Sequence, residues 1–259
     1  MQLRHEVERL GGQDLIGVCG VSAGQLDAGG EIKHRSTIAV RLSVYGPPMI
    51  GRRTLPPPLD LDWPMKAWED AELELRYERG HMIMTIEHET VRGVTPAMLD
   101  WWFRHIAGEM AVDGRTYSRY RVWHPRDHID WQLVGGDPAR VGVGARFRIV
   151  EALDRNPAWL IDSVETVTKL DETGIRLERW ILGSDVFSLE HWFEPVPEGT
   201  RYRSRMELGA DTAFGRLLFN RLIRPMIFSD LMGPAWLRHN VEEVGNFELF
   251  LPDLYAREA

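Results

Sequence analysis

Two residues near the C-terminus, His239 and Glu243, are four positions apart and could both bind a metal ion. In a helix this spacing places the two side chains on one face, about 6 Å apart at their origins. At about 100° per residue, the same stripe carries three aromatic residues, Trp236, Phe247 and Phe250. Glu242 falls on the solvated side of that helix. The pair is therefore either two ligands for an ion such as zinc or an ion pair on a helix surface.

A further carboxylate, Glu151, has an unexpected position in a predicted strand over residues 145–153. Side chains alternate between the faces of a strand, so Glu151 shares the apolar face with Ile149, while Arg146 and Arg148 point to solvent. A carboxylate on an apolar face is costly unless a cation meets it. The alternative is that Glu151 lies at the strand end and reaches solvent.

Imidazoles and a phenol complete the set of candidate groups. His124 ends a predicted strand over residues 118–124, and His128 follows after a proline-stiffened turn. His191 lies on an apolar strand face, and Tyr202 lies on the inward face of the last predicted strand. Taken singly, each of these residues could equally be an ordinary core residue with its hydrogen bonds satisfied.

Together, two carboxylates and at least two imidazoles are expected to point from sheet and helix into one space. Two neutral histidines and two carboxylates would neutralise a divalent cation, which gives the buried charges a partner. A mixed set of nitrogen and oxygen ligands suits Zn²⁺, and Mn²⁺ or Fe²⁺ would also accept it.

The elements that must position these groups follow a simple order. A strand is predicted over residues 81–93, and a helix over 97–106 begins with Thr95 as N-cap and Pro96 in its first turn. Short connections favour an antiparallel sheet for the strands that follow. These strands are predicted over residues 118–124, 145–153, 159–167, 175–182, 186–193 and 201–208. Helices over 214–223 and 234–251 end the chain.

One sheet with one apolar face must bury that face, and the terminal helix is the available cover. Curling the sheet around this helix leaves a cavity, so the expected fold is α+β, a helix-grip arrangement like the Bet v 1 fold, over residues 61–259. Residues 1–60 contain several glycines, one predicted strand over 36–45 and the stiff connector Leu55–Leu59. They are predicted to form an N-terminal appendage whose function is unknown.

Composition excludes several classes of protein. The 259 residues include 31 Lys and Arg against 39 Asp and Glu, a net charge of −8 that argues against a nucleic-acid partner. The single Cys19 excludes an internal disulfide and fits a reducing compartment. No apolar run approaches the roughly 18 residues of a membrane span, and the N-terminus does not resemble a secretory signal. A cytoplasmic protein without membrane contact is expected.

Three motifs resemble the diacetylphloroglucinol hydrolase and phloretin hydrolase family over about residues 90–255. They are Trp101-Trp102-Phe103, the Tyr-x-x-Trp-His-Pro-x-Asp-His run at 120–128, and the run from His239 to Asn246 followed by Leu251-Pro252. The resemblance implies a Bet v 1-like helix-grip domain with a catalytic zinc held by two His and two Glu. It also implies hydrolysis of the carbon–carbon bond between an acyl group and a polyhydroxylated aromatic ring, so the expected partner is a small aromatic acyl substrate.

Carried over onto this sequence, the resemblance implies four metal ligands, His128, Glu151, His239 and Glu243. His128 is preferred to His124 because the family pattern has a tyrosine eight residues before the ligand, and Tyr120 stands there. His124 is the alternative.

In the expected mechanism, zinc lowers the pKa of bound water toward about 7 and polarises the acyl carbonyl. We expect Tyr120, Tyr202 and His191 to hold the phenolic oxygens and deliver a proton to the ring carbon, while Glu151 acts as ligand and proton carrier. Two other functions stay open: a non-catalytic helix-grip protein that binds a hydrophobic ligand, and a metal-free polyketide cyclase or dehydratase. The sequence leaves open the acyl group, the ring substitution and the oligomeric state, for which a homodimer is considered.

Overall fold

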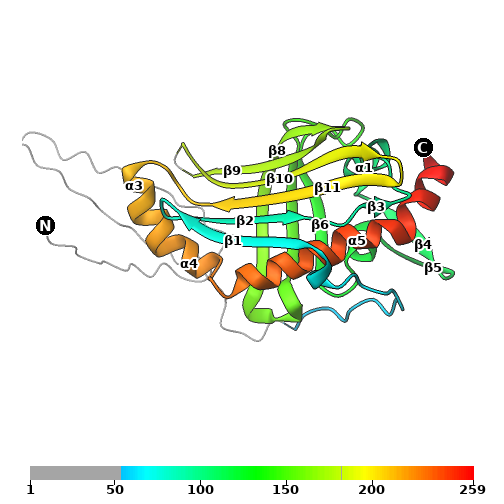
Figure 1. The fold of residues 1–259 in the computed structure, drawn as a ribbon, viewed down its shortest axis with the longest axis horizontal. Helices are drawn as coiled ribbons and strands as arrows, with labels where there is room; N and C mark the ends of the chain where they lie inside the picture. Colours follow the sequence, from blue (N-terminus) through cyan, green and yellow to red (C-terminus); the bar gives the residue numbers. More distant parts are fainter. Residues whose placement is uncertain (1–53, 182) are drawn as a thin grey trace, which may run out of the picture. The chain divides into compact units, whose positions relative to one another are not determined.

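A long antiparallel sheet bends around one C-terminal helix in the computed structural model, which describes residues 54–181 and 183–259. The helix, α5 (Met232–Glu258), runs along the inner face of the sheet (Figure 1). The strand order is β1-β2-β11-β10-β9-β8-β7-β6, and the short β3 pairs with β11. The predicted α+β helix-grip arrangement is confirmed.

The strands of this sheet are β1 (Glu72–Glu78), β2 (His81–Glu87), β3 (Val91–Arg92), β6 (His128–Gly135), β7 (Arg146–Ala152), β8 (Leu160–Asp171), β9 (Gly174–Ile181), β10 (Ser184–Val196) and β11 (Gly199–Leu208). A separate hairpin comprises β4 (Glu109–Val112) and β5 (Arg115–Ser118). The remaining helical elements are η1 (Trp68–Asp70), α1 (Pro96–His105), α2 (Arg119–Trp123), η2 (Leu153–Arg155), η3 (Pro157–Trp159), α3 (Ala213–Gly215), the π-helical η4 (Arg216–Ile223) and α4 (Arg224–Ile227).

Most predicted elements are present with small shifts of their ends. The five strands predicted between residues 145 and 208 correspond to β7 to β11, although residue 182 lies outside the described residues. The helix predicted over residues 97–106 corresponds to α1. The Thr95 hydroxyl accepts a hydrogen bond from the backbone N–H of Met98 at 3.3 Å. This N-cap satisfies one of the donors that a helix start leaves free.

Two predicted strands differ from the structure. Residues 119–123 form α2 instead of a strand, because the indole N–H of Trp123 donates to the backbone carbonyl of Glu243 at 2.8 Å and fixes this segment against α5. The predicted strand over residues 81–93 is divided into β2 and β3. The hydrogen bond of Trp123 joins segments far apart in the sequence, so the alternation of side chains does not indicate it.

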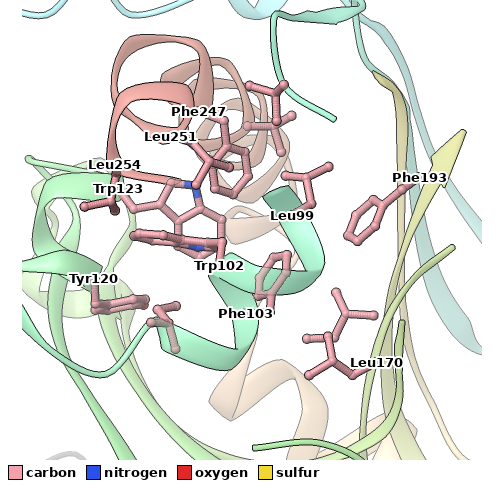
Figure 2. Packing of buried hydrophobic residues seen from close by; sticks show 14 of the residues in the cluster. Leu99, Trp102, Phe103, Tyr120, Trp123, Leu170, Phe193, Phe247, Leu251 and Leu254 are labelled. Carbon is pink, nitrogen blue, oxygen red and sulfur yellow. The ribbon is translucent and has the colours of Figure 1, made fainter. Parts of the chain in front are cut away.

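The main core lies between α1, α5 and the concave face of the sheet (Figure 2). Trp102 of α1 packs against Phe250 of α5 with ring centroids 5.0 Å apart. Phe103 stacks on Phe193 of β10 with centroids 6.2 Å apart. These aromatic contacts fix α5 relative to the sheet, and hence fix the side chains that both elements direct inward.

Residues 1–53, including the predicted strand over 36–45, lie outside the described residues, so the predicted N-terminal appendage stays a prediction. The described end of the proline connector packs on the helix-grip unit. Arg121 and Arg155 donate to the backbone carbonyls of Pro57 and Pro56, both at 2.6 Å. Among the described helices, none combines the length and apolar sequence that a bilayer crossing requires.

Candidate metal centre

Four buried side chains converge between the sheet and α5. Nε2 of His128 lies 3.8 Å from Oε2 of Glu151 and 3.3 Å from Oε2 of Glu243. Nε2 of His239 lies 3.6 Å and 3.7 Å from the same two carboxylate oxygens. Each of the four residues is exposed by 8% or less. The two histidines and two glutamates that the sequence singled out are thus brought to one point.

The spacing of these atoms matches metal ligands better than hydrogen-bonded partners. Ligand bonds of the length found at zinc, arranged as a tetrahedron, separate neighbouring ligand atoms by about 3.4 Å. The nitrogen–oxygen distances here run from 3.3 to 3.8 Å, and most exceed the length of a normal hydrogen bond. The donor set therefore fits a divalent cation in both geometry and chemistry.

The remaining ring nitrogens of both histidines are already engaged. Nδ1 of His128 lies 2.7 Å from the backbone carbonyl of Tyr120, which can only accept, so Nδ1 carries the proton. Nδ1 of His239 donates in the same way to Oδ2 of Asp127 at 3.1 Å. The Asp127 oxygens also accept the backbone N–H groups of Asp154 and Arg155, at 3.0 and 3.1 Å. These contacts leave the Nε2 atoms facing the two glutamates, the orientation found in metal-binding histidines.

The electrostatics of the cluster are unbalanced without a cation. Burial, and next the charge of His239, lower the pKa of His128 to about 3. Burial alone would lower the pKa of His239 too, but Glu151 and Asp127 outweigh it and raise that pKa to about 10. Burial raises the pKa of Glu243 to about 7, although His239 opposes this. A divalent cation bound between these four groups would neutralise the two carboxylates.

The positions of the four groups follow from one strand pair and one helix. His128 begins β6 directly opposite Glu151 of β7, so the pairing of these strands brings both to one end of the sheet. His239 and Glu243 are one turn apart on α5 and both buried, as the helical periodicity predicts. The predicted inward orientation of Glu151 agrees with its burial.

The prediction that Glu242 lies on the solvated side of its helix is wrong. Glu242 is only 8% exposed, because α5 is covered on more than one side. Next to it, Lys66 lies so close over Gly245 that a Cβ there would be 2.7 Å from the lysine side chain. The amphipathic pattern assumes one buried face, whereas this helix lies inside the fold.

His124, the alternative ligand, is fully buried and has different partners. Its Nδ1 accepts the backbone N–H of Asp127 at 3.1 Å, so its proton is on Nε2, which donates to Glu242 at 3.1 Å. Its ring stacks on His239 with centroids 4.3 Å apart. His124, Asp127 and His239 form a second group of closely spaced donor atoms, but both nitrogens of His124 already have partners. His128 is therefore the stronger candidate ligand.

Tyr120 lies at the edge of the cluster. Its hydroxyl donates to Oε2 of Glu151 at 3.1 Å, and its ring stacks on His128 with centroids 3.8 Å apart. Burial, followed by the charge of Glu151, raises the pKa of Tyr120 well above its usual value. Tyr120 therefore stays protonated and orients both a carboxylate and an imidazole.

Tyr202 and His191 lie on the flank of the cluster and pack against each other, with ring centroids 5.3 Å apart. The Tyr202 hydroxyl is buried and has no hydrogen-bond partner among the described residues. Burial, and then the charge of Glu243, raise the pKa of Tyr202 well above its usual value. Burial lowers the pKa of His191 to about 3, so this imidazole is neutral at pH 7. Neither residue adds a ligand; the charge of Glu243 acts on Tyr202, and His191 packs against Tyr202.

Sequence reasoning missed several residues of the site. Asp127 orients His239, and Asn240 donates to the Glu243 carboxylate. The Ser204 hydroxyl lies 2.8 Å from both Nε2 of His88 and Nδ1 of His191. Asp127 adjoins His128 in the sequence, which offered a signal. Asn240 lies three residues before Glu243 on the same helix, a spacing that also offered a signal. The contacts of Ser204 depend on strand pairing, so no local pattern indicates them.

Comparison with known proteins shows similarity to one family of hydrolases. Residues 75–142 match the family model of the DAPG hydrolase PhiG domain. Phloretin hydrolase from Eubacterium ramulus is 25% identical over 187 residues, covering 64% of this chain. The match spans 65% of that protein's own length, just under two thirds. The resemblance to the diacetylphloroglucinol and phloretin hydrolase family is confirmed.

Solved structures with similar chain traces include that of Ara h 8.0201, with 14% identity and a TM-score of 0.37, covering 64% of this chain and 98% of that one. Another is protein Ms6760 from Mycobacterium smegmatis, with 11% identity and a TM-score of 0.39, covering 71% of this chain and 99% of that one.

Proposed function

We propose that the protein is a metal-dependent hydrolase that cleaves the carbon–carbon bond between an acyl group and a polyhydroxylated aromatic ring. The single observation that carries the proposal is the convergence of two imidazole nitrogens and two carboxylates, with spacings of 3.3 to 3.8 Å, in a buried site. The family resemblance supports the reaction class, because the matching family model and the curated relative are both hydrolases.

The residues that would hold the cation are His128, Glu151, His239 and Glu243. Zn²⁺ suits this set of nitrogen and oxygen donors best, and Mn²⁺ or Fe²⁺ is compatible with it. When bound, such a cation supplies water of lowered pKa and polarises a ketone oxygen. A second task then remains for the protein: it must stabilise the ring as a leaving group.

The reaction consumes one water molecule. The oxygen of water bonds to the acyl carbon, the bond from that carbon to the ring carbon breaks, and the ring carbon takes a proton. The products are a carboxylic acid and a polyphenol. Hydroxyls next to the acyl group allow the ring to adopt a keto form, so the departing carbon leaves as an enolate and not as a bare carbanion.

Tyr202, His191 and Glu151 are the groups proposed to act on the substrate, and Tyr120 positions Glu151. The unpartnered hydroxyl of Tyr202 is free to donate to a ring oxygen, which favours the enolate. His191 is neutral at pH 7 and can accept or donate a hydrogen bond without bringing a charge into the site. Tyr120 holds Glu151 in place, and Glu151 is the proposed proton carrier.

Metal analysis combined with an activity assay tests this proposal. Untagged protein is expected to contain about one equivalent of a divalent metal and to release free acid from acylated phloroglucinols or dihydrochalcones. His239→Ala and Glu243→Ala are each expected to abolish both metal and hydrolysis. His105→Ala is the matched control, because His105 lies on the exposed surface of α1.

The alternatives predict different outcomes of the same experiment. Metal-free protein whose stability is unchanged by a chelator, together with ligand binding but no turnover, would favour a helix-grip carrier of hydrophobic ligands. Turnover of a polyketide-like substrate without metal would favour a cyclase or dehydratase that uses tyrosine and histidine. Full hydrolysis by either ligand variant refutes the assigned site.

A further inference from the structure

Glu165 of β8 is a buried carboxyl group to which the proposed mechanism gives no role. It is only 3% exposed, and its Oε2 has no hydrogen-bond partner among the described residues. Ser163, two residues earlier on the same strand, is a hydrogen-bonding neighbour of its side chain. A buried polar atom without a partner is rare in a folded protein and calls for an explanation such as a bound ligand.

The strand register places Glu165 on the same concave face as the metal centre. On β8, Ile161 pairs with Glu151 and Glu165 pairs with Phe147 of β7. Glu165 is therefore displaced from Glu151 along the sheet by four residues, and both side chains point toward α5. The charges of both glutamates act on Tyr120, whose hydroxyl donates to Glu151.

The apolar residues around Glu165 are incompletely covered. Ile149 of β7 and Ile161 and Ser163 of β8 lie between Glu151 and Glu165 on this face, and all three are only half-buried. The face between the metal centre and Glu165 is thus mainly apolar and incompletely covered, as a site for an aromatic ring requires.

We propose that Glu165 binds the ring hydroxyl opposite the acyl carbon and thereby selects aryl ketones that carry this hydroxyl. This inference rests on the proposed function. Four residues of strand span about 13 Å, so the two carboxyl groups lie at opposite ends of the face that the aromatic ring would cover. An aryl ketone bound through its carbonyl at the metal centre would direct its para hydroxyl along the sheet toward Glu165.

A carboxyl group suits this task for chemical reasons. Burial raises the pKa of Glu165 to about 7, while Ser163 and the positive charge of Arg179 on β9 favour the ionised form. An ionised carboxylate accepts a hydrogen bond from a phenolic hydroxyl, and such charge-assisted bonds are stronger than neutral ones. A substrate without that hydroxyl leaves the buried carboxylate unpaired, which disfavours its binding.

Two aryl methyl ketones test the inference: one has hydroxyls at both ortho positions and the para position, and its analogue lacks only the para hydroxyl. In the metal-loaded protein, kcat/KM is expected to be about 10- to 100-fold higher for the para-hydroxylated ketone. In Glu165→Leu the ratio is expected to fall close to one, mainly through KM. Glu165→Gln, which keeps the shape of the side chain, is expected to give an intermediate ratio and serves if the leucine variant does not fold.

Glu178→Gln is the matched control, because Glu178 lies on the convex face of β9 and should leave the ratio unchanged. An unchanged ratio in folded Glu165→Leu, or in Glu165→Gln if only that variant folds, overturns the inference and leaves the proposed function intact. If the wild-type protein hydrolyses neither ketone, the proposed function fails. Calorimetric binding of the same two ketones then decides: a preference that is lost in the Glu165 variants supports the inference, and equal affinities in wild type overturn it.

Discussion

Nδ1 of His239 and Oδ2 of Asp127 are 3.1 Å apart, and both residues are buried at the end of the sheet. This contact fixes the ring orientation of His239 and determines that its Nδ1 carries a proton. In Asp127→Asn, the amide N–H₂ would face either this ring N–H or the backbone N–H groups that now donate to the carboxylate. We expect metal affinity to fall by about 10- to 100-fold, measured by competition with a chromophoric chelator.

Asp130→Asn is the control for this substitution. Asp130 lies three residues further along the chain, and its side chain is half-exposed at the surface beside Gln132. Its replacement should leave metal affinity unchanged. Equal affinities of Asp127→Asn and wild type would mean that Asp127 does not position His239.

The hydrogen bond from Tyr120 to Glu151 should contribute to stability as well as to metal binding. Tyr120→Phe leaves the buried Glu151 carboxylate without this donor, whose distance is 3.1 Å. We expect the free energy of unfolding to fall by about 1–3 kcal/mol, measured by urea denaturation of the metal-loaded protein. Tyr117→Phe, a change at a half-buried position of β5, should cost much less. A loss no greater than in this control would contradict the assigned role.

Periodicity was sufficient to predict the central part of the site. His239 and Glu243 share a helical stripe with buried aromatic residues, and Glu151 alternates with outward arginines, so both patterns place polar groups inside. The order of strands and the terminal helix was predictable for a related reason. Short connections restrict neighbouring strands to antiparallel pairs, and a single apolar sheet face needs one cover.

The remainder of the site depends on contacts between distant segments. Glu242 is buried because α5 is covered on more than one side, and the sequence of the helix alone does not indicate the second cover. Residues 119–123 have the composition of a strand, but Trp123 and its hydrogen bond to the Glu243 carbonyl fix them as a helical turn. Ser204 bridges His88 and His191 through strand pairings that local patterns do not specify.

Ser204 should affect turnover without affecting the metal. Its hydroxyl has one proton, so it can donate to only one of His88 and His191 and must accept from the other if both bonds form. Ser204→Ala removes this constraint on the His191 ring. We expect unchanged metal content and a kcat lowered by about fivefold, the equivalent of one ordinary hydrogen bond. Ser188→Ala, on the convex face of β10, is the control, and an unchanged kcat in Ser204→Ala would exclude His191 from the reaction.

Glu165 should make the protein less stable at alkaline than at acidic pH. Burial raises the pKa of Glu165 from 4.5 to about 7 in the folded protein, so between these values the folded state binds more protons than the unfolded state. The stabilisation is therefore fully present below pH 4.5 and is lost as the pH rises through 7. The full effect is on the order of 3 kcal/mol, because each unit of pKa shift corresponds to about 1.4 kcal/mol.

Glu165→Gln removes this titration and keeps the shape of the side chain. Relative to wild type, the variant should gain up to about 3 kcal/mol in the free energy of unfolding at pH 8 and almost nothing at pH 4.5. Urea denaturation of both proteins across this range measures the difference, and all other titrating groups contribute equally to the two curves. Parallel curves would mean that Glu165 is already ionised at low pH and paired in the folded protein. Curves that separate as the pH rises would instead establish that the fold tolerates a costly carboxylate beside the candidate metal centre, as expected of a group retained for binding.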